Sequence, residues 1–455
     1  MFHIKSTKIL LGILLLAVCL HAAFANAREK EVVQTIDVAK VWSGHPVGFA
    51  LLTHGERQFV AFYDAERQMT VGSRTLDSDA WQFTRLPSKI GWDSHNYITM
   101  AIDDDGQIHL CGNMHCVPLI YFRTTRPLDA TSFEQITAMI GRNEQRCTYP
   151  RFLRSAAGSE GRCAAGELLF VYRDGGSGNG CRYFNVYDLK SKAWRRLFDE
   201  PLFSGGGKMN AYFQGPVRDR QGVFHVCWVW RDTPDCATNH HLSYVRSKDL
   251  MHWQTSAGKP LKLPITIDNA EVVDPVPPGG GIINGNTKLG FDADGRVIVS
   301  YHKFDAAGNT QIYNARREPG GWKIYQATDW DYRWEFSGGG AIPFLVRVGS
   351  VTAGADGTLT QSCSNPKNGS GTWRLDPATL KPVGPAPPSD RLPKQITRLE
   401  STRPGMAVRS ASDTGHSEDP AVGYVMRWET LPRNRDRAHD GEPPEPSMLR
   451  VYKLK

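Results

Sequence analysis

The feature that most constrains the fold is a long internal repeat built from short β-strands. Runs of alternating apolar and polar residues, such as "FVAFYD", "GELLFVYRD", "VFHVCWVWRD" and "RVIVSYHKFD", are separated by turns rich in Gly, Asp and Asn. Turns of the type D-x-x-G or D-x-G recur, and large residues follow at regular intervals: Trp81, Phe133, Trp194, Trp253 and Trp322. The steps are 52, 61, 59 and 69 residues, and Leu380 continues the series more weakly.

This period predicts a β-propeller. A repeat of about sixty residues with about four strands is typical of one propeller blade, so about 425 mature residues correspond to seven blades. We therefore predict an all-β fold, a single-domain seven-bladed β-propeller that spans residues 28–455. The strand around Val32–Trp42 is expected to close the ring beside the final "MLRVYKLK". Two β-sandwiches would need a linker near the middle, and none is visible, whereas residues 430–447 suggest an exposed loop.

The N-terminus predicts export. Lys5 and Lys8 precede an apolar stretch, residues 9–24, that is short for a membrane span, and Ala25-Asn26-Ala27 is a small-x-small cleavage site. We expect a signal peptide over residues 1–27 and a periplasmic or secreted protein. No other stretch is long and apolar enough to span a membrane.

The charge distribution favours an acidic substrate. The net charge is +7, with 22% charged residues and no long Lys/Arg runs. This pattern disfavours nucleic acid as a partner and favours acidic small molecules, oligosaccharides or polysaccharides. It specifies no oligomeric state.

The cysteines could form disulfides or bind a metal ion, and the sequence leaves both alternatives open. Once Cys19 is removed with the signal peptide, eight cysteines remain, an even number that favours disulfides in an exported protein. The local candidate pairs are Cys227–Cys236 and Cys163–Cys181. The alternative is a metal site at Cys227, Cys236, His240 and His241, although its spacing fits no standard zinc pattern. No loop matches a calcium pattern, so no cofactor is required and a structural Ca²⁺ or Zn²⁺ stays open.

Two histidines flank one hairpin. In "DSHNYITMAIDDDGQIHLCGNMHC", residues 93–116, the turn D-D-D-G separates two apolar strands. If residues 97–102 and 107–111 form those strands, His95 and His115 lie at the same open end of the hairpin.

Polar residues inside apolar strands recur once or twice per repeat. They are rich in His, Tyr, Arg, Asn and Trp, which suits sugar hydroxyls, sugar faces and carboxylates. The candidates for substrate binding are Asn96, Asn210, Trp230, Arg231, His240, Asn286 and His302. No pair of catalytic carboxylates stands out, which disfavours an ordinary two-carboxylate glycosidase. A His/Tyr/Arg set instead suits β-elimination from a uronic acid, in which Arg neutralises the carboxylate and Tyr or His moves protons.

Several segments together resemble a known family. "GHPVGFALLT", "WDSHNYITMAIDDDGQIHLCGNMH", "CTYPRF", "YRDG", "KMNAY", "WVWRDTPDCATNHHLSY", "INGNTKLGFD" and "SYHKFDAAGNTQIYNAR" resemble the BNR-repeat family of seven-bladed propellers, and "SKDLMHW" resembles a degenerate Asp-box. That family includes ulvan lyases, L-rhamnose-α-1,4-D-glucuronate lyases and related α-L-rhamnosidases. The resemblance covers residues from about 38 to 345 and is strongest to the rhamnose–glucuronate branch, whose substrates occur in arabinogalactan proteins and gum arabic.

The resemblance implies a set of site residues. For a lyase it implies His95, His115, Tyr149, Arg173 and Tyr212, with Arg173 on the uronate carboxylate and Tyr or His as base and acid. An extra loop, "SAAGSEGRCAAG", separates Tyr149 from Arg173.

Two other functions stay open. The rhamnosidase group is described as using the opposite face of the propeller and an essential histidine near the N-terminus, which His45 in "SGHPVGF" resembles. That hydrolase would act on the same linkage. A non-catalytic sugar-binding propeller is the third alternative, and it predicts that the five lyase residues do not converge.

Overall fold

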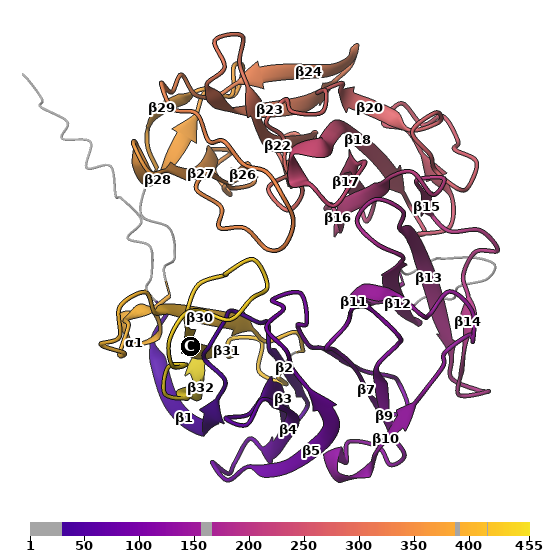
Figure 1. Ribbon diagram of the computed structural model, residues 1–455, viewed down its shortest axis with the longest axis vertical. Helices are drawn as coiled ribbons and strands as arrows, with labels where there is room; N and C mark the ends of the chain where they lie inside the picture. Colours follow the sequence, from indigo (N-terminus) through magenta and orange to yellow (C-terminus); the bar gives the residue numbers. More distant parts are fainter. Residues whose placement is uncertain (1–29, 156–165, 387–391, 416) are drawn as a thin grey trace, which may run out of the picture.

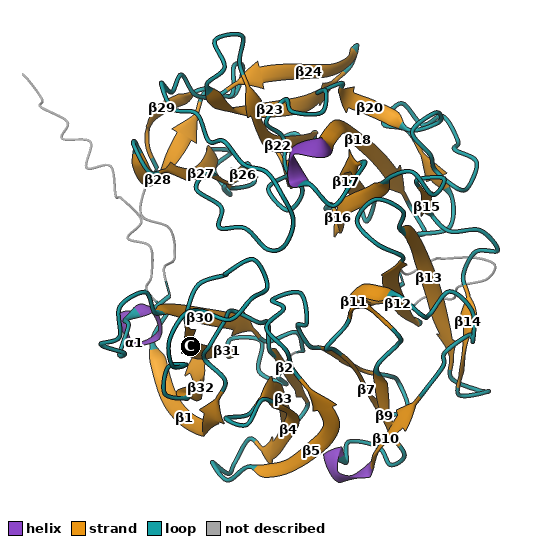
Figure 2. Cartoon of the chain, in the orientation of Figure 1, coloured by secondary structure: helices purple, strands orange, loops and turns teal. Residues whose placement is uncertain are grey.

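The chain folds almost entirely into β-strands. The computed structural model describes residues 30–155, 166–386, 392–415 and 417–455, so the predicted signal peptide and Cys163 lie outside the described residues. The described helices are short: η1 (Ala130–Ser132), η2 (Cys236–Thr238) and α1 (Lys394–Thr397) (Figure 2). In the described ranges, no helix has the length and apolar character needed to cross a membrane.

The described strands form seven antiparallel sheets that follow one another around a common centre (Figure 1). The first contains β2 (Ala50–His54), β3 (Arg57–Tyr63), β4 (Gln68–Thr75) and β5 (Gln82–Lys89). The second contains β6 (Thr99–Ile102), β7 (Ile108–Cys111), β9 (Tyr121–Thr124) and β10 (Phe133–Ile136). The third contains β8 (His115–Val117), β11 (Cys147–Arg154), β12 (Leu168–Asp174), β13 (Cys181–Asp188), β14 (Ala193–Arg196) and β15 (Phe203–Ser204).

The remaining four sheets complete the series. The fourth contains β16 (Asn210–Arg218), β17 (Phe224–Arg231), β18 (Asn239–Ser247), β19 (Trp253–Gln254) and β20 (Glu271–Asp274). The fifth contains β21 (Lys288–Phe291), β22 (Val297–Phe304), β23 (Thr310–Glu318) and β24 (Gly321–Gln326). The sixth contains β25 (Arg347–Val348), β26 (Thr352–Ala353), β27 (Leu359–Asn365), β28 (Gly369–Leu375) and β29 (Pro382–Pro385). The seventh contains β30 (Ala407–Ser412), β31 (Gly423–Thr430), β32 (Ser447–Leu454) and β1 (Val32–Val41).

The sequence repeat marks one edge of six sheets. Its large residues lie at or beside the last strand of each sheet, namely β5, β10, β14, β19, β24 and β29. Trp194 and Trp253 are buried there, and Leu380 is buried just before β29. Leu380 is therefore a true sixth member of the series.

The seventh sheet joins the two ends of the chain, as the sequence predicts. β1 pairs with β32 in antiparallel register, with Ile36 opposite Val451 and Lys40 opposite Met448. Both Ile36 and Val451 are buried. The N-terminal strand thus completes a sheet whose other strands come from the C-terminus.

The recurring Asp turns have a common physical cause. In three of them, Asp103, Asp219 and Asp292 each accept hydrogen bonds from backbone N–H groups two and four residues further on. Asp103 and Asp219 also bond to the buried imidazoles of His109 and His225. One carboxylate therefore shapes the turn and anchors the strand that follows it.

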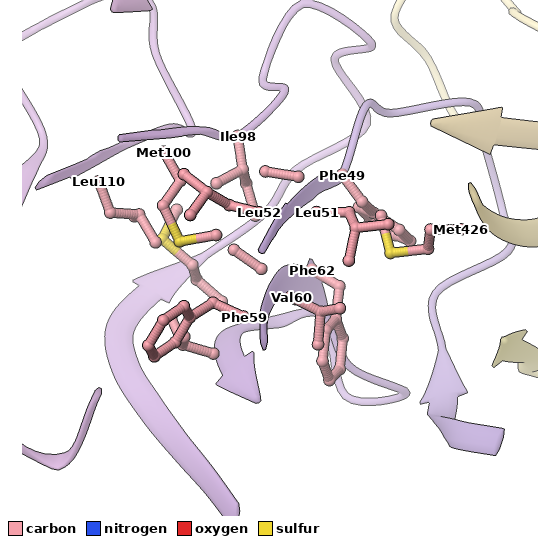
Figure 3. Close-up of a cluster of buried hydrophobic side chains, with 14 of the residues drawn as sticks. Phe49, Leu51, Leu52, Phe59, Val60, Phe62, Ile98, Met100, Leu110 and Met426 are labelled. Atoms are coloured by element: carbon pink, nitrogen blue, oxygen red, sulfur yellow. The ribbon is translucent and has the colours of Figure 1, made fainter. Parts of the chain in front are cut away.

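Apolar side chains fill the space between neighbouring sheets. Figure 3 shows one such cluster, with Phe49, Leu51 and Phe59 from the first sheet and the segment just before it. These side chains lie between those of the second sheet and the segment just before it (Ile98, Met100 and Leu110) and Met426 of the seventh sheet. β2 and β3 of the first sheet are buried on both faces, which explains their nearly continuous apolar runs.

The structure corrects the expected cysteine chemistry. Cys227 and Cys236 are both free, as are the other described cysteines: Cys111, Cys116, Cys147, Cys181 and Cys363. Cys227 packs in a cluster with Tyr212, whereas Cys236 packs in a different cluster with Trp334. The expected Cys227–Cys236 disulfide is therefore wrong, and those two thiols do not meet with His240 and His241 in a metal site.

Candidate active site

The first hairpin of the second sheet brings two imidazoles together. β6 and β7 pair from Thr99↔Cys111 to Ile102↔Ile108, so the segments that carry His95 and His115 leave the hairpin at the same end. Their ring centroids lie 4.3 Å apart. After the hairpin, β8 crosses to the third sheet, where His115 pairs with Thr148 of β11. This crossing places both histidines beside the third sheet.

One carboxylate holds both imidazoles. Asp93 accepts a 2.6 Å hydrogen bond from Nδ1 of His95 through one oxygen and a hydrogen bond from Nδ1 of His115 through the other. Burial acts to raise the pKa of Asp93, but the bonds from His115 and His95 outweigh it, so this pKa lies well below its ordinary value. Asp93 therefore stays ionised, and both Nε2 atoms are left for another partner.

Tyr149 lies against this pair from a strained position in β11. A bulge separates Thr148 from Arg151 in the pairing with β12, and Tyr149 within it has a φ of 57°. Its ring lies 5.8 Å from His95 and 6.2 Å from Tyr212 of β16. Burial raises the pKa of Tyr149 well above its ordinary value despite three nearby arginines, so its hydroxyl keeps its proton at neutral pH.

Two arginines lie directly opposite each other beneath Tyr149. Arg173 near the end of β12 pairs in register with Arg182 near the start of β13, and their exposed fractions are 1% and 3%. The guanidinium carbons lie 5.0 Å and 5.8 Å from the centre of the Tyr149 ring.

Neither of these arginines has a carboxylate partner in the described chain. Arg173 donates to the Thr148 hydroxyl at 3.0 Å, to Cys116 Sγ at 3.2 Å and to the Tyr212 hydroxyl at 3.4 Å. Two nitrogens of Arg182, Nε and Nη1, are buried without any hydrogen-bond partner. Burial, and then repulsion from Arg173, lowers the pKa of Arg182 to about 9, so it is still cationic at neutral pH.

These groups surround two adjoining cavities. One, of about 330 Å³, is lined by His95, Tyr149, Arg182 and Tyr212 among others. The second, of about 130 Å³, shares His95, Tyr149 and Tyr212 and adds His115 and Arg231. Among the described residues, no Asp or Glu lines either cavity. Asp93 itself does not line either cavity and contacts the site through its hydrogen bonds to the two histidines.

Residues 430–447 form the largely exposed loop that the sequence predicts, and part of this loop also reaches the site. Asp436 accepts hydrogen bonds from the Ala341 backbone N–H at 2.8 Å and from the Ser94 hydroxyl at 3.2 Å. One of its oxygens lies 3.6 Å from Nδ1 of His95. Arg433, three residues earlier, lines both cavities.

Three predicted binding residues lie close to the cavities. Arg231 lines the smaller one and donates to Asn284 Oδ1 at 3.4 Å. Asn210 is buried beside Arg173, since a Cβ on Gly180 would contact both side chains. Asn286 lines a neighbouring cavity, and its side chain bonds to the backbone of Val346 and Val348.

The structure places four other predicted binding residues away from the linings of these cavities. Trp230 is fully buried against Trp228 in the apolar core. His302 is buried against Trp334 and Phe336. Asn96 is buried, with its backbone oxygen bonded to the Tyr63 hydroxyl, and His240 is bonded to Asp232 and His241. None of the four lines a cavity described above.

His45 is also placed differently from its expected position. It is 2% exposed, its Nδ1 accepts a 2.9 Å hydrogen bond from Trp42 Nε1, and Trp92 packs against it. Burial lowers the pKa of His45 to about 4, and a contact with Asp93 acts in the opposite sense. His45 thus lies buried and in contact with Asp93, the residue that holds the histidine pair.

One group of side chains has the geometry to hold a metal ion. Asp93, His95 and His115 form the one such group found in the described ranges, with ligand atoms within 4.8 Å of one another. A bound metal would replace the hydrogen bonds that Asp93 now accepts from both Nδ1 atoms.

Sequence reasoning missed Asp93 and Arg182. The spacing Asp93-Ser94-His95 was a usable signal, because an Asp two residues before a histidine in a turn can reach its Nδ1. Arg182 gave no signal, because its pairing with Arg173 appears only once β12 and β13 are in register.

Comparisons with known proteins agree with this architecture. A family described as BNR repeat-containing matches residues 57–330. The structure of an ulvan lyase, a polysaccharide lyase, aligns with a TM-score of 0.56 at 13% identity, covering 92% of this chain and 96% of the other. The same enzyme bound to -[GlcA(1-4)Rha3S]- gives the same values. An α-L-arabinofuranosidase from Fusarium graminearum aligns at a TM-score of 0.38 and 10% identity, covering 78% and 92%. No curated protein matches the sequence.

Proposed function

Since the chain belongs to the BNR repeat-containing family, we propose that its seven sheets are the blades of one closed propeller domain and that its cavity cleaves an acidic polysaccharide. The proposed reaction is β-elimination at L-rhamnose-α-1,4-D-glucuronate linkages of the arabinogalactan or gum arabic type. The ulvan lyase that shares this fold has a solved structure bound to -[GlcA(1-4)Rha3S]-.

The observation that carries this proposal is the uncompensated pair Arg173 and Arg182. A buried guanidinium without an anionic partner is costly, and a bound carboxylate would remove that cost. Arg182 reaches the larger cavity, whereas Arg173 lies behind the Tyr149 ring. A uronate carboxylate bound there gains charge-assisted hydrogen bonds, which strengthen as negative charge develops next to C5.

The proton transfers follow from the protonation states of the neighbouring groups. Nδ1 of each histidine donates to Asp93, so the Nε2 lone pair of one imidazole accepts the C5 proton. The hydroxyl of Tyr149, which keeps its proton, donates it to the departing O4. The C5–H and C4–O4 bonds break and a C4=C5 bond forms, and exchange with solvent restores both groups. Because no acid lines the cavities in the described chain, two-carboxylate hydrolysis lacks its usual groups.

Export and independence from metals are part of the same proposal. We propose that residues 1–27 direct the chain to the periplasm or the exterior, where acidic polysaccharides are found. We also propose that Asp93, His95 and His115 work as a hydrogen-bonded set, so that dialysis against a chelator leaves the activity unchanged.

One assay tests the reaction. The protein is incubated with a rhamnosyl-α-1,4-glucuronate oligosaccharide while the ultraviolet absorbance of the C4=C5 bond and free rhamnose are measured. Rhamnose released together with the double bond supports elimination, whereas rhamnose alone would favour an α-L-rhamnosidase. If neither product forms, the result would favour a non-catalytic sugar-binding protein. Arg182→Gln is expected to abolish both signals, and Arg57→Gln, which removes an exposed charge on β3, serves as its control.

A further inference from the structure

A third and larger cavity adjoins the candidate active site. It measures about 690 Å³ and shares Tyr97, Gly285, Phe344 and Arg433 with the 330 Å³ cavity, so the two lie side by side. Residues of β21, β25 and β30, which begin the fifth, sixth and seventh sheets, line its wall.

The charge of this space is strongly one-sided. Four cationic side chains line it: Lys288, Arg347, Arg409 and Arg433. In the part of the chain that the structure describes, no Asp or Glu joins that lining. Burial, followed by repulsion from neighbouring arginines, lowers the pKa of Arg409. The cations are therefore close enough to disfavour one another.

These arginines also lack ion-paired or hydrogen-bonded partners among the described residues, although Asp436 lies close enough to Arg433 to raise its pKa against the larger effect of burial. Within the described ranges, Arg347, Arg409 and Arg433 form no ion pair and donate no side-chain hydrogen bond, although Arg433 lies 6.0 Å from the Phe344 ring. The Nε atom of Arg409 is buried without a partner. Lys288 donates only to the Gly285 carbonyl, at 2.9 Å.

Two buried arginines elsewhere in the molecule have carboxylate partners. The buried guanidinium of Arg316 bonds to Glu318 at 2.7 Å, and buried Arg427 bonds to Glu429. Unpaired charges that converge in one concave space raise its electrostatic potential and cost stability, so their convergence needs another explanation. An anion that occupies the space with its substrate supplies one.

We propose that Arg347, Arg409 and Arg433, with Lys288, form a second anion-binding site that takes a carboxylate or sulfate on a sugar residue next to the cleaved uronate. This inference rests on the proposed function, because it assumes that the first uronate occupies the arginine pair. It makes the substrate a chain with at least two acidic groups close together, and not a neutral chain that ends in one acidic unit.

The test measures binding without turnover. In a Tyr149→Phe background, isothermal titration calorimetry measures the affinities of three probes. They are a rhamnosyl-α-1,4-glucuronate disaccharide, the same disaccharide with a sulfate on rhamnose, and an unsulfated tetrasaccharide with two glucuronates. At least one of the two doubly acidic probes should bind about tenfold more tightly than the plain disaccharide, as one charge-assisted interaction allows. A gain with sulfate identifies sulfate as the second anion, and a gain with the tetrasaccharide identifies a carboxylate.

A double variant locates that gain. Arg347→Gln/Arg409→Gln should abolish the tighter binding and leave the affinity for the plain disaccharide within about twofold. Arg57→Gln/Arg220→Gln removes the same charge from exposed positions and should keep the gain. Since Arg347 and Arg409 repel each other, the thermal unfolding temperature of the double variant should be unchanged or higher.

The inference is overturned if the three probes bind with equal affinity, or if the Arg347→Gln/Arg409→Gln variant still binds a doubly acidic probe more tightly. It is also overturned if that variant loses affinity for the plain disaccharide to the same degree. A failure of the proposed elimination would show separately, as a missing double bond with the unmodified protein.

Discussion

At the scale of single residues, Asp93 organises the candidate site. One ionised carboxylate accepts hydrogen bonds from two imidazoles and so sets the tautomer and orientation of both. Groups that orient a catalytic histidine typically matter nearly as much as the histidine itself.

Asp93→Asn should therefore lower kcat by on the order of 10²–10³-fold, because an amide offers one acceptor oxygen for two N–H donors. The thermal unfolding temperature should change little, since the amide keeps the shape of the carboxylate. Steady-state kinetics on the uronate substrate measure the effect. A kcat within about threefold of the unmodified protein would show that Asp93 does not orient the reacting groups.

Buried histidines give the stability a defined pH dependence. Burial lowers the pKa of His302 to about 4, and a backbone contact at Gly281 acts more weakly in the opposite sense. The folded pKa lies below the unfolded value of about 6.5, so the unfolded chain binds a proton first as the pH falls. This contribution is complete above pH 6.5 and is lost between about pH 6.5 and 4, up to about 3 kcal/mol.

His302→Leu should accordingly lose less unfolding free energy than the unmodified protein between pH 7 and pH 4.5. Urea unfolding at the two pH values measures the difference. His54→Leu, at an exposed position, should follow the unmodified protein. Equal pH slopes for all three proteins would contradict the assignment.

At the scale of elements, the bulge in β11 shows how the sheet supports chemistry. A non-glycine residue with φ of 57° is strained, and a bulge redirects its side chain out of the regular alternation. The strain aims the Tyr149 ring at the histidine pair and the arginine pair.

Tyr149→Phe keeps the ring and the backbone and removes only the hydroxyl. It should lower kcat by on the order of 10²–10⁴-fold, the usual contribution of a general acid. Because that hydroxyl donates to no described residue, the unfolding temperature should stay the same. A lower unfolding temperature with an unchanged kcat would show that Tyr149 is a packing residue.

The β1–β32 pairing is the element that joins the chain ends. Ile36 of β1 is buried in the core, whereas Lys40 on the same strand is exposed. Ile36→Ala should lower the free energy of unfolding by about 2–5 kcal/mol, as is usual for a truncated core side chain. Lys40→Ala should have almost no effect. Chemical denaturation compares the two, and equal values would mean that β1 contributes little to the closing sheet.

At the scale of the whole molecule, the unpaired arginines form one electrostatic feature. They line three neighbouring cavities in a protein whose net charge is +7. Attraction of an acidic chain should weaken as salt screens it.

We expect KM to rise several-fold between about 0.05 M and 0.5 M NaCl, with kcat nearly constant, because screening acts on encounter and binding. A substrate whose other carboxylates are reduced, so that only the reacting uronate is charged, should show a smaller rise. A salt-independent KM for both substrates would contradict the binding of an acidic chain by the arginines that line these cavities.

The sequence by itself determined the all-β class, the repeat and the pairing of the two chain ends, because alternation and turn residues act locally. It also placed His95 and His115 at one end of a hairpin, since hairpin geometry follows from a turn and two strands. These are properties of neighbouring residues, and they can be read along the chain.

Only the tertiary structure decided which polar residues face the cavity. Trp230 and His302 have side chains typical of a sugar site but lie in the core, whereas Arg182 and the arginines of the 690 Å³ cavity gave no signal in sequence. Strand register and the packing of separate sheets determine these positions. A guanidinium becomes a binding group when no carboxylate lies near it, and that depends on residues that are distant in the chain.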